Sequence, residues 1–233
     1  MYYLTRILER YKKTTTPRET KGNEELTSEG IENAVPLMMA AARAHQRASL
    51  LCRRIARDNS FTIDTWYFTQ VSFELILLSV EQSLRLLFLL HFSTPIKASP
   101  YKLHELHYLY NEVQKGREGK EGVSSDYIIR KMDDLGHMGK ISEDDLVDCL
   151  KRYNSSYSDY RYFHVHWKGT LIESKPGIPL PDQDMFHLLA EALLYLNQEK
   201  VKKEGFDVIG MTIVPESGMT EEQKAVREWL ISG

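Results

Sequence analysis

The feature that most constrains the fold is an apolar run over residues 73–92. The run is interrupted by Glu74, Glu81, Gln82 and Arg85. A span across a bilayer needs about 20 predominantly apolar residues. The interrupted run therefore favours a buried core helix over a membrane anchor.

Apolar residues also recur at helical spacing before this run, over residues 28–55. Pro36 must lie in the first turn of that helix or kink it, because proline cannot donate a backbone hydrogen bond. The central helix itself is expected to open near Thr62 or Asp64 and to end near His91. The sequence thus predicts two long helices joined by a short connection.

Four further helices are expected, over residues 100–116, 124–132, 142–150 and 185–200. Pro100 suits the first turn of the first of these. Ser142 with Asp145 opens the third, as a side-chain cap at a helix start does. A stiff connection formed by Pro176, Pro179 and Pro181 precedes the fourth of these helices, which Asp182 is expected to cap.

These patterns predict an all-α domain over residues 29–204, with extensions over residues 1–28 and 205–233. The one strand-like run covers residues 206–214, and a single run does not make a sheet. Thr220 begins a last helix, which we expect to dock as an appendage.

The charge balance limits the kinds of partner. Lys and Arg total 30 against 33 for Asp and Glu, so the net charge is −3. Without an overall positive field, nucleic-acid binding must come from a local patch or from an oligomer that concentrates charge. Such binding would depend strongly on salt.

The ends and the cysteines indicate a cytoplasmic protein. Residues 1–13 carry five charged side chains and no long apolar core, which does not fit a secretory signal. Cys52 and Cys149 lie in apolar helical patterns and do not form a C-x-x-C spacing. We expect them to be reduced thiols, as in cytosolic proteins.

Residues 160–166, Tyr-Arg-Tyr-Phe-His-Val-His, are expected to be helical and carry the best candidates for chemistry. Arg161 can hold a phosphate through its charged guanidinium, and His166 can transfer a proton near neutral pH. On an ideal helix these two lie about 140° apart, whereas Arg161 and His164 are neighbours. Either the helix ends or distorts near Lys168-Gly169, or a dimer supplies the partner, or His164 is the operative imidazole.

Two other segments precede this one: the Leu-rich helix with its embedded glutamates, and residues 104–109, His-Glu-Leu-His-Tyr-Leu. In this order the chain resembles the HEPN superfamily of up-and-down helical bundles. In that family a Leu- and Ala-rich helix with an embedded Glu precedes a His-Asp-Leu helix start, and Glu105 stands here in place of the Asp. A later helix carries Arg, four to six residues, then His, to which Arg161 and His166 correspond.

The resemblance implies a metal-independent endoribonuclease that works without a cofactor. It further implies a homodimer whose Arg161 and His166 side chains meet at one cleft and cleave RNA through attack by the ribose 2′-hydroxyl. His164, Tyr160 and Tyr162 would lie beside them, with His104 nearby. Active members commonly carry a small polar residue directly after the arginine, whereas this chain has Tyr162 at that position.

The family also suggests a toxin or phage-defence setting, with an antitoxin or regulatory protein as a possible partner and no membrane. Many HEPN-like proteins lack the nuclease pair, so a non-catalytic module for dimerisation and partner or nucleotide binding is the alternative. A metal site at His104 and His107 is a third reading, although the zinc-protease pattern His-Glu-x-x-His is not present. The chain has neither a glycine-rich phosphate loop nor a Gly-x-Ser-x-Gly elbow.

Overall fold

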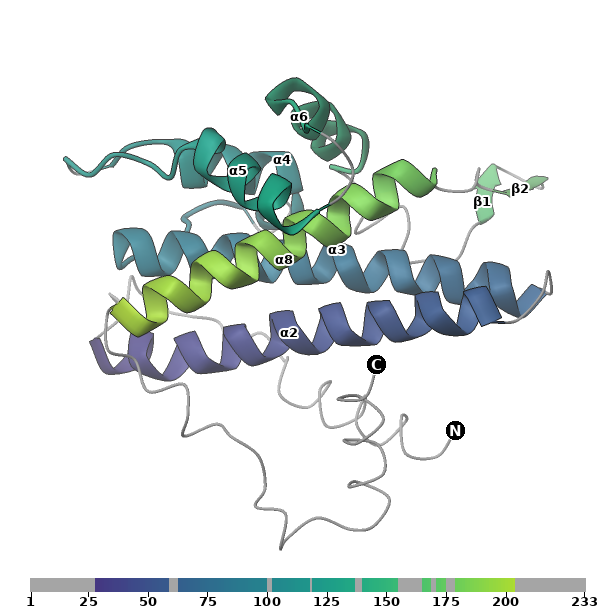
Figure 1. Cartoon of the computed structure of the whole chain (residues 1–233), viewed down its shortest axis with the longest axis horizontal. Helices are drawn as coiled ribbons and strands as arrows, with labels where there is room; N and C mark the ends of the chain where they lie inside the picture. The colour runs from purple at the N-terminus through teal and green to yellow at the C-terminus, as the bar shows by residue number, and fades with distance from the viewer. Residues whose placement is uncertain are drawn as a thin grey trace, which may run out of the picture.

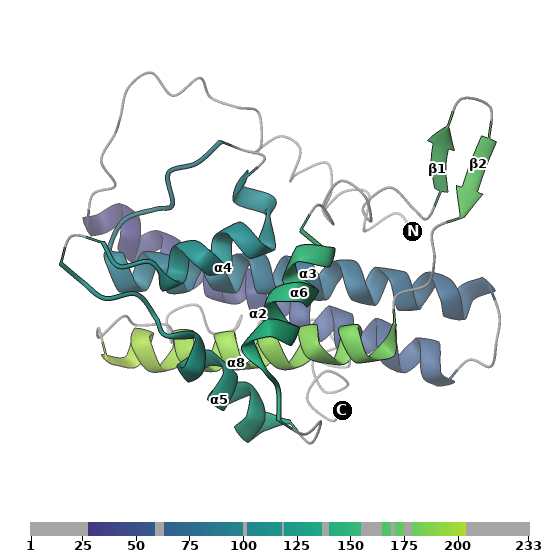
Figure 2. The same cartoon turned by 90° about the horizontal axis from the view of Figure 1, so that it is seen from above.

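The computed structural model describes residues 28–58, 63–99, 102–117, 119–136, 140–154, 165–168, 171–174 and 179–203. Three long helices run side by side: α2 (Ser28–Asp58), α3 (Ile63–Phe92) and α8 (Leu180–Lys203). Three shorter ones lie together on the face of α3 and α8 that is turned away from α2 (Figures 1 and 2): α4 (Leu106–Gln114), α5 (Ser125–Leu135) and α6 (Glu143–Arg152). The predicted all-α bundle is confirmed.

A seam of small residues joins α2 to α3. Along α2 the buried residues Ala42, Ser49 and Ala56 are seven positions apart, which keeps them on one face. The Ser49 hydroxyl donates to the Ser72 carbonyl at 2.6 Å, and the Ser72 hydroxyl donates to the Ser49 carbonyl at 2.8 Å. One heptad along, the Ser79 hydroxyl donates to the Ala42 carbonyl at 2.8 Å. Hydroxyls that reach the backbone of the opposite helix show that the two helices pack closely.

Helix α3 forms the centre of the core. Within it Tyr67–Phe92 is long and apolar enough to cross a membrane by length and composition, with a mean hydropathy of 1.6. In this fold 72% of that apolar window is buried, so the segment is a core helix as predicted. Its apolar residues contribute to both buried clusters, one shared with α4, α5, α6 and α8 and one shared with α2 and α8.

The helix predicted to run from Pro100 is interrupted. A 3₁₀ turn, η1 (Lys102–His104), is separated from α4 by Glu105, whose backbone is extended. In a continuous helix the Leu103 carbonyl would accept from the His107 amide. Here that carbonyl accepts from Arg85 on α3, and the His107 amide donates to the Asn154 side chain at 3.0 Å. Distant side chains therefore replace the bond that a continuous helix would make.

The shorter helices begin and end close to the predicted positions. Ser142 caps α6, because its hydroxyl accepts from the Asp145 amide at 3.1 Å. Helix α5 ends at Leu135, and a side chain on the next residue, Gly136, would collide with Leu188 of α8. Helix α2 starts at Ser28 and α3 ends at Phe92, so the predicted hairpin of long helices is confirmed.

Pro36 lies well past the first turn of α2, inside the helix, which excludes the first-turn alternative for this proline. The predicted start of the helix near Asp182 was wrong. Helix α8 begins at Leu180, five residues before the predicted start. Pro181 and Asp182 therefore belong to its first turn, where proline needs no amide partner and a carboxylate favours the positive helix end.

The remaining expectations concern other parts of the chain. The strand-like run over residues 206–214, the helix from Thr220 and residues 1–27 lie outside the described residues. Cys52 is partly buried and Cys149 is buried, and both are free thiols.

Candidate active site

The structure corrects the end of the helix predicted over residues 160–166, of which it describes residues 165 and 166. His166 lies in β1 (Val165–Lys168), which pairs antiparallel with β2 (Leu171–Ser174), and its Cα partner is Glu173. Tyr160, Arg161, Tyr162 and His164 lie outside the described residues. The hairpin lies beyond the first turn of α8, to one side of the bundle (Figures 1 and 2).

The local sequence explains the hairpin. Val165 and Trp167 precede the turn and Ile172 follows it, and β-branched and aromatic residues of this kind favour strands. Lys168 pairs with Leu171, which leaves a two-residue connection that contains Gly169. Two-residue connections with glycine are typical of tight hairpins. The strand signal was present in the sequence but was outweighed by the expected helical motif.

A charged cluster joins α3 to the start of α4. Glu81, whose side chain is 4% exposed, binds Arg85 at 2.8 Å one helical turn further along α3. His104 Nδ1 lies 3.2 Å from both oxygens of the Glu81 carboxylate. Arg85 Nε also donates to the Leu103 carbonyl at 3.1 Å, which fixes η1 beside α3. His104 therefore binds a glutamate side chain of the neighbouring helix.

This arrangement orients the His104 imidazole. An ionised carboxylate only accepts hydrogen bonds, so the ring hydrogen belongs on Nδ1. In the neutral ring Nε2 is then the basic nitrogen, which suits proton transfer to or from a ligand. The His104 side chain is 33% exposed, so solvent can reach part of it. A buried carboxylate that orients a partly exposed imidazole is a common feature of acid–base sites.

His107 extends this region along α4. Its Nε2 accepts from the Asn111 side-chain amide at 3.2 Å. Burial lowers the pKa of His107 below its usual value; nearby Lys151 lowers it further, and Glu105 opposes the change. His107 is therefore predominantly neutral at pH 7. Its backbone amide holds Asn154, the last described residue before the segment that carries Arg161.

The described part of the chain supplies no set of ligands for the third hypothesis, a metal site at His104 and His107. No group of three or more His, Cys, Asp or Glu side chains gathers there in a way that could hold an ion. His104 is engaged with Glu81, and His107 with Asn111.

A second polar cluster lies between the end of α6 and the start of α8. The Tyr153 hydroxyl donates to Asp182 at 2.8 Å, and Arg152 donates to the other oxygen of this carboxylate at 3.3 Å. Next to it lies an open cavity of about 700 Å³, lined by Lys140, Ile141, Asp145, Asp148, Lys151, Arg152 and Met185. Because its lining carries both signs of charge, the cavity favours no single class of ligand.

The sequence analysis did not predict the buried polar layer between α2, α3 and α8. Ser49 and Ser72 use their hydroxyl hydrogens on each other's carbonyls, so His187 Nε2 is the donor in its 3.4 Å contact with Ser49. Burial lowers the pKa of His187 to about 4, and the charge of Arg53 adds to this effect. Arg53 is paired with Asp184. The seven-residue spacing of small residues was the one signal in the sequence that could have located this layer.

Protein-family models, curated proteins and solved structures offer no match to this chain.

Proposed function

We propose that this protein is a metal-independent endoribonuclease of the HEPN type. Arg161 stabilises the phosphoryl charge and His166 transfers protons, with His164, Tyr162 and Tyr160 beside them. Each of these two roles is worth at least about 10²-fold in rate. The all-α bundle is consistent with this assignment.

The observation that carries the proposal is the contact between Glu81 and His104. The resemblance rests on a Leu-rich helix with an embedded glutamate and on a helix start that begins with histidine. These elements are 23 residues apart at the contact, and nothing in their separate patterns requires them to touch. The contact supports a common arrangement in which His104 is a second, preoriented imidazole near the RNA.

Asn154 supports the same location for the chemistry. It joins the end of α6 to the start of α4 through the 3.0 Å bond from the His107 amide. The chain therefore enters the segment with Arg161 from a point beside α4. We propose that RNA is bound between this segment and the His104 region.

The test is cleavage of a mixed RNA pool in EDTA. Wild-type protein is compared with Arg161→Ala, His166→Ala and His104→Ala. Arg130→Ala, at an exposed position of α5, is the matched control. We expect the first two to lose at least about 100-fold in rate, and the control to cut normally. Intact RNA with the wild type, or equal cutting by all variants, would refute the nuclease assignment.

The strand at His166 favours one other candidate function. Residues 165–168 form a strand, whereas the Arg–His motif of the family is helical. This difference favours a non-catalytic module for dimerisation and partner or nucleotide binding. We propose a cytoplasmic homodimer in both cases, and for the nuclease a toxin or phage-defence role restrained by an antitoxin or regulatory protein. Sedimentation analysis tests the dimer, and a purely monomeric protein would argue against a shared cleft.

A further inference from the structure

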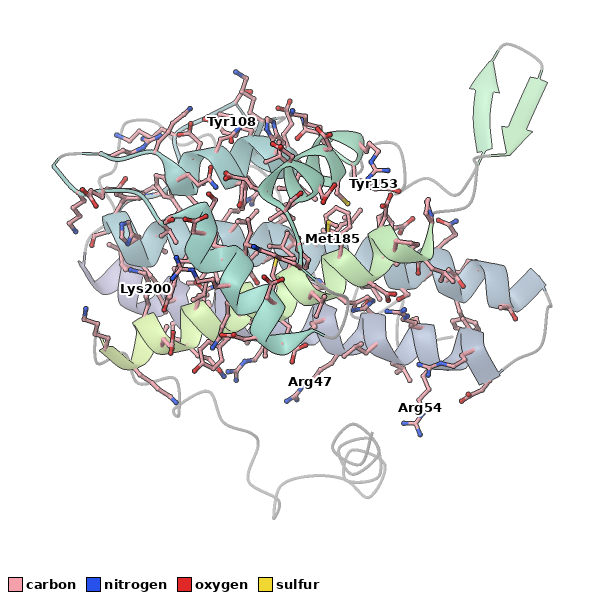
Figure 3. The ribbon with its side chains drawn as sticks, turned by 45° about the horizontal axis from the view of Figure 1, so that its top comes forward. Arg47, Arg54, Tyr108, Tyr153, Met185 and Lys200 are labelled. Atoms are coloured by element: carbon pink, nitrogen blue, oxygen red, sulfur yellow. The ribbon has the colours of Figure 1, made fainter. Side chains whose placement is uncertain are left out.

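The outer face of α2 is exposed from Leu37 to the end of the helix. The exposed residues follow one stripe, namely Leu37, Ala40, Ala44, Arg47, Leu50, Arg54 and Arg57, and Asp58 ends the helix. Figure 3 shows Arg47 and Arg54 extending away from the rest of the bundle. Helices α3 and α8 contact α2 on its other side.

This face concentrates positive charge. From residue 33 to residue 57 the helix has five arginines and no acidic residue, in a chain whose net charge is −3. Arg53 is the one member of this group that pairs with a carboxylate among the described residues, through Asp184. The stripe is thus the local basic patch that an acidic protein needs in order to bind a polyanion.

The spacing of the arginines suits an extended anion. Arg43, Arg47, Arg54 and Arg57 recur every three, four or seven residues, so they share one face over about 21 Å of helix. Arg43 is half-buried beside Arg47, and burial and the neighbouring charge both lower its pKa. Guanidinium groups bind phosphate oxygens through two parallel hydrogen bonds, which lysine cannot do.

We propose that the arginine stripe of α2, formed by Arg43, Arg47, Arg54 and Arg57, is a binding surface for the phosphate backbone of RNA. The choice of RNA rests on the proposed nuclease function; the phosphate chemistry rests on the stripe itself. An anionic membrane fits less well, because insertion requires an apolar face. Among the described residues of α2, the large apolar side chains that are exposed are Leu37 and Leu50, at 60% and 48%.

The experiment measures fluorescence anisotropy of a labelled 20-nucleotide RNA strand with the full chain, between 50 and 200 mM salt. The riboses of this strand are 2′-O-methylated, so it lacks the attacking hydroxyl and stays intact while it keeps the phosphate backbone. The stripe variant combines Arg47→Gln, Arg54→Gln and Arg57→Gln. A control variant loses the same charge at exposed positions elsewhere, through Arg130→Gln, Lys140→Gln and Lys202→Gln. Circular dichroism verifies that both fold.

We expect the stripe variant to bind at least about tenfold more weakly than the control. The slope of log Kd against log salt should fall by about 2, since each lost phosphate contact contributes about 0.7 for single strands. Equal affinities of the two variants, or no binding by the wild type at 50 mM salt, would overturn the proposal. The proposal would also fail if the stripe variant kept its affinity for RNA but no longer bound vesicles of anionic lipid. That result would assign the face to a membrane.

This outcome is independent of cleavage. If the wild type binds RNA through the stripe but leaves it intact, the stripe stands and the nuclease assignment fails. If RNA is cleaved and the stripe variant matches the control in kcat/KM and in affinity, the nuclease assignment stands and the stripe proposal fails.

Discussion

At the scale of single residues, Glu81 is the side chain on which most of the candidate site depends. Its carboxylate is nearly buried and serves both Arg85 and His104. Periodicity predicted a core helix here and identified Glu81 only as an interruption. The partners of such a residue come from another element, so they are visible only once the helices are packed.

Replacement of Glu81 by glutamine should lower the free energy of unfolding by about 2 kcal/mol. Loss of one partner in a buried ion pair leaves the other charge uncompensated, which destabilises a protein by about 3–5 kcal/mol. We expect a smaller loss here because Arg85 and His104 are partly exposed to solvent. Urea denaturation provides the measurement, with Glu105→Gln as the control. An equal effect of the two substitutions would contradict this role for Glu81.

His187 should make stability depend on pH. Its pKa of about 4 in the folded protein lies below the usual 6.5, so the unfolded chain takes up a proton first as the pH falls. The free energy of unfolding should therefore drop between pH 6.5 and pH 4, by up to about 3 kcal/mol. Urea midpoints at pH 7 and pH 4.5 should differ less for His187→Gln than for the wild type. Equal differences would show that other groups cause the dependence.

At the scale of elements, helices whose signals are local were predictable, and those that depend on distant partners were not. Ser142 and Gly136 mark helix ends by their own chemistry, and both predictions hold. The break at Glu105 needs Arg85 and Asn154, which lie far away in sequence. The helix expected over residues 160–166 was wrong at its described end, where Val165 and His166 belong to a strand, because a strand signal competed there with a family motif.

The seam between α2 and α3 predicts a contrast between two alanines of one helix. Ala42 faces α3 and is fully buried, whereas Ala40 faces outward. Ala42→Leu should destabilise the protein by about 1–3 kcal/mol or more, because added methylenes overpack a close interface. Ala40→Leu should change stability by less than about 0.5 kcal/mol. The urea midpoints of the two variants make the comparison, and similar values would rule out close packing.

At the scale of the whole molecule, α3 ties both apolar clusters together. Cys149 lies in the larger cluster, and burial, with the charge of Asp182, raises its thiol pKa to about 12. In a Cys52→Ser variant, we expect a disulfide reagent to modify Cys149 only as fast as the bundle unfolds. The labelling rate should rise with urea in parallel with the loss of helical circular dichroism. Rapid labelling in buffer would show that the cluster opens locally.

The hydrogen bond between Tyr153 and Asp182 has a consequence for how the protein is built. The 28 residues between them include β1, β2 and Arg161, and the described ends of this stretch meet at one point of the bundle. We therefore expect the stretch to be separable from the helices. Replacing residues 156–178 by a short glycine-serine linker should keep the helical spectrum and the thermal transition while abolishing RNA cleavage. The helices would then be a platform whose chemistry could be exchanged without redesigning its core.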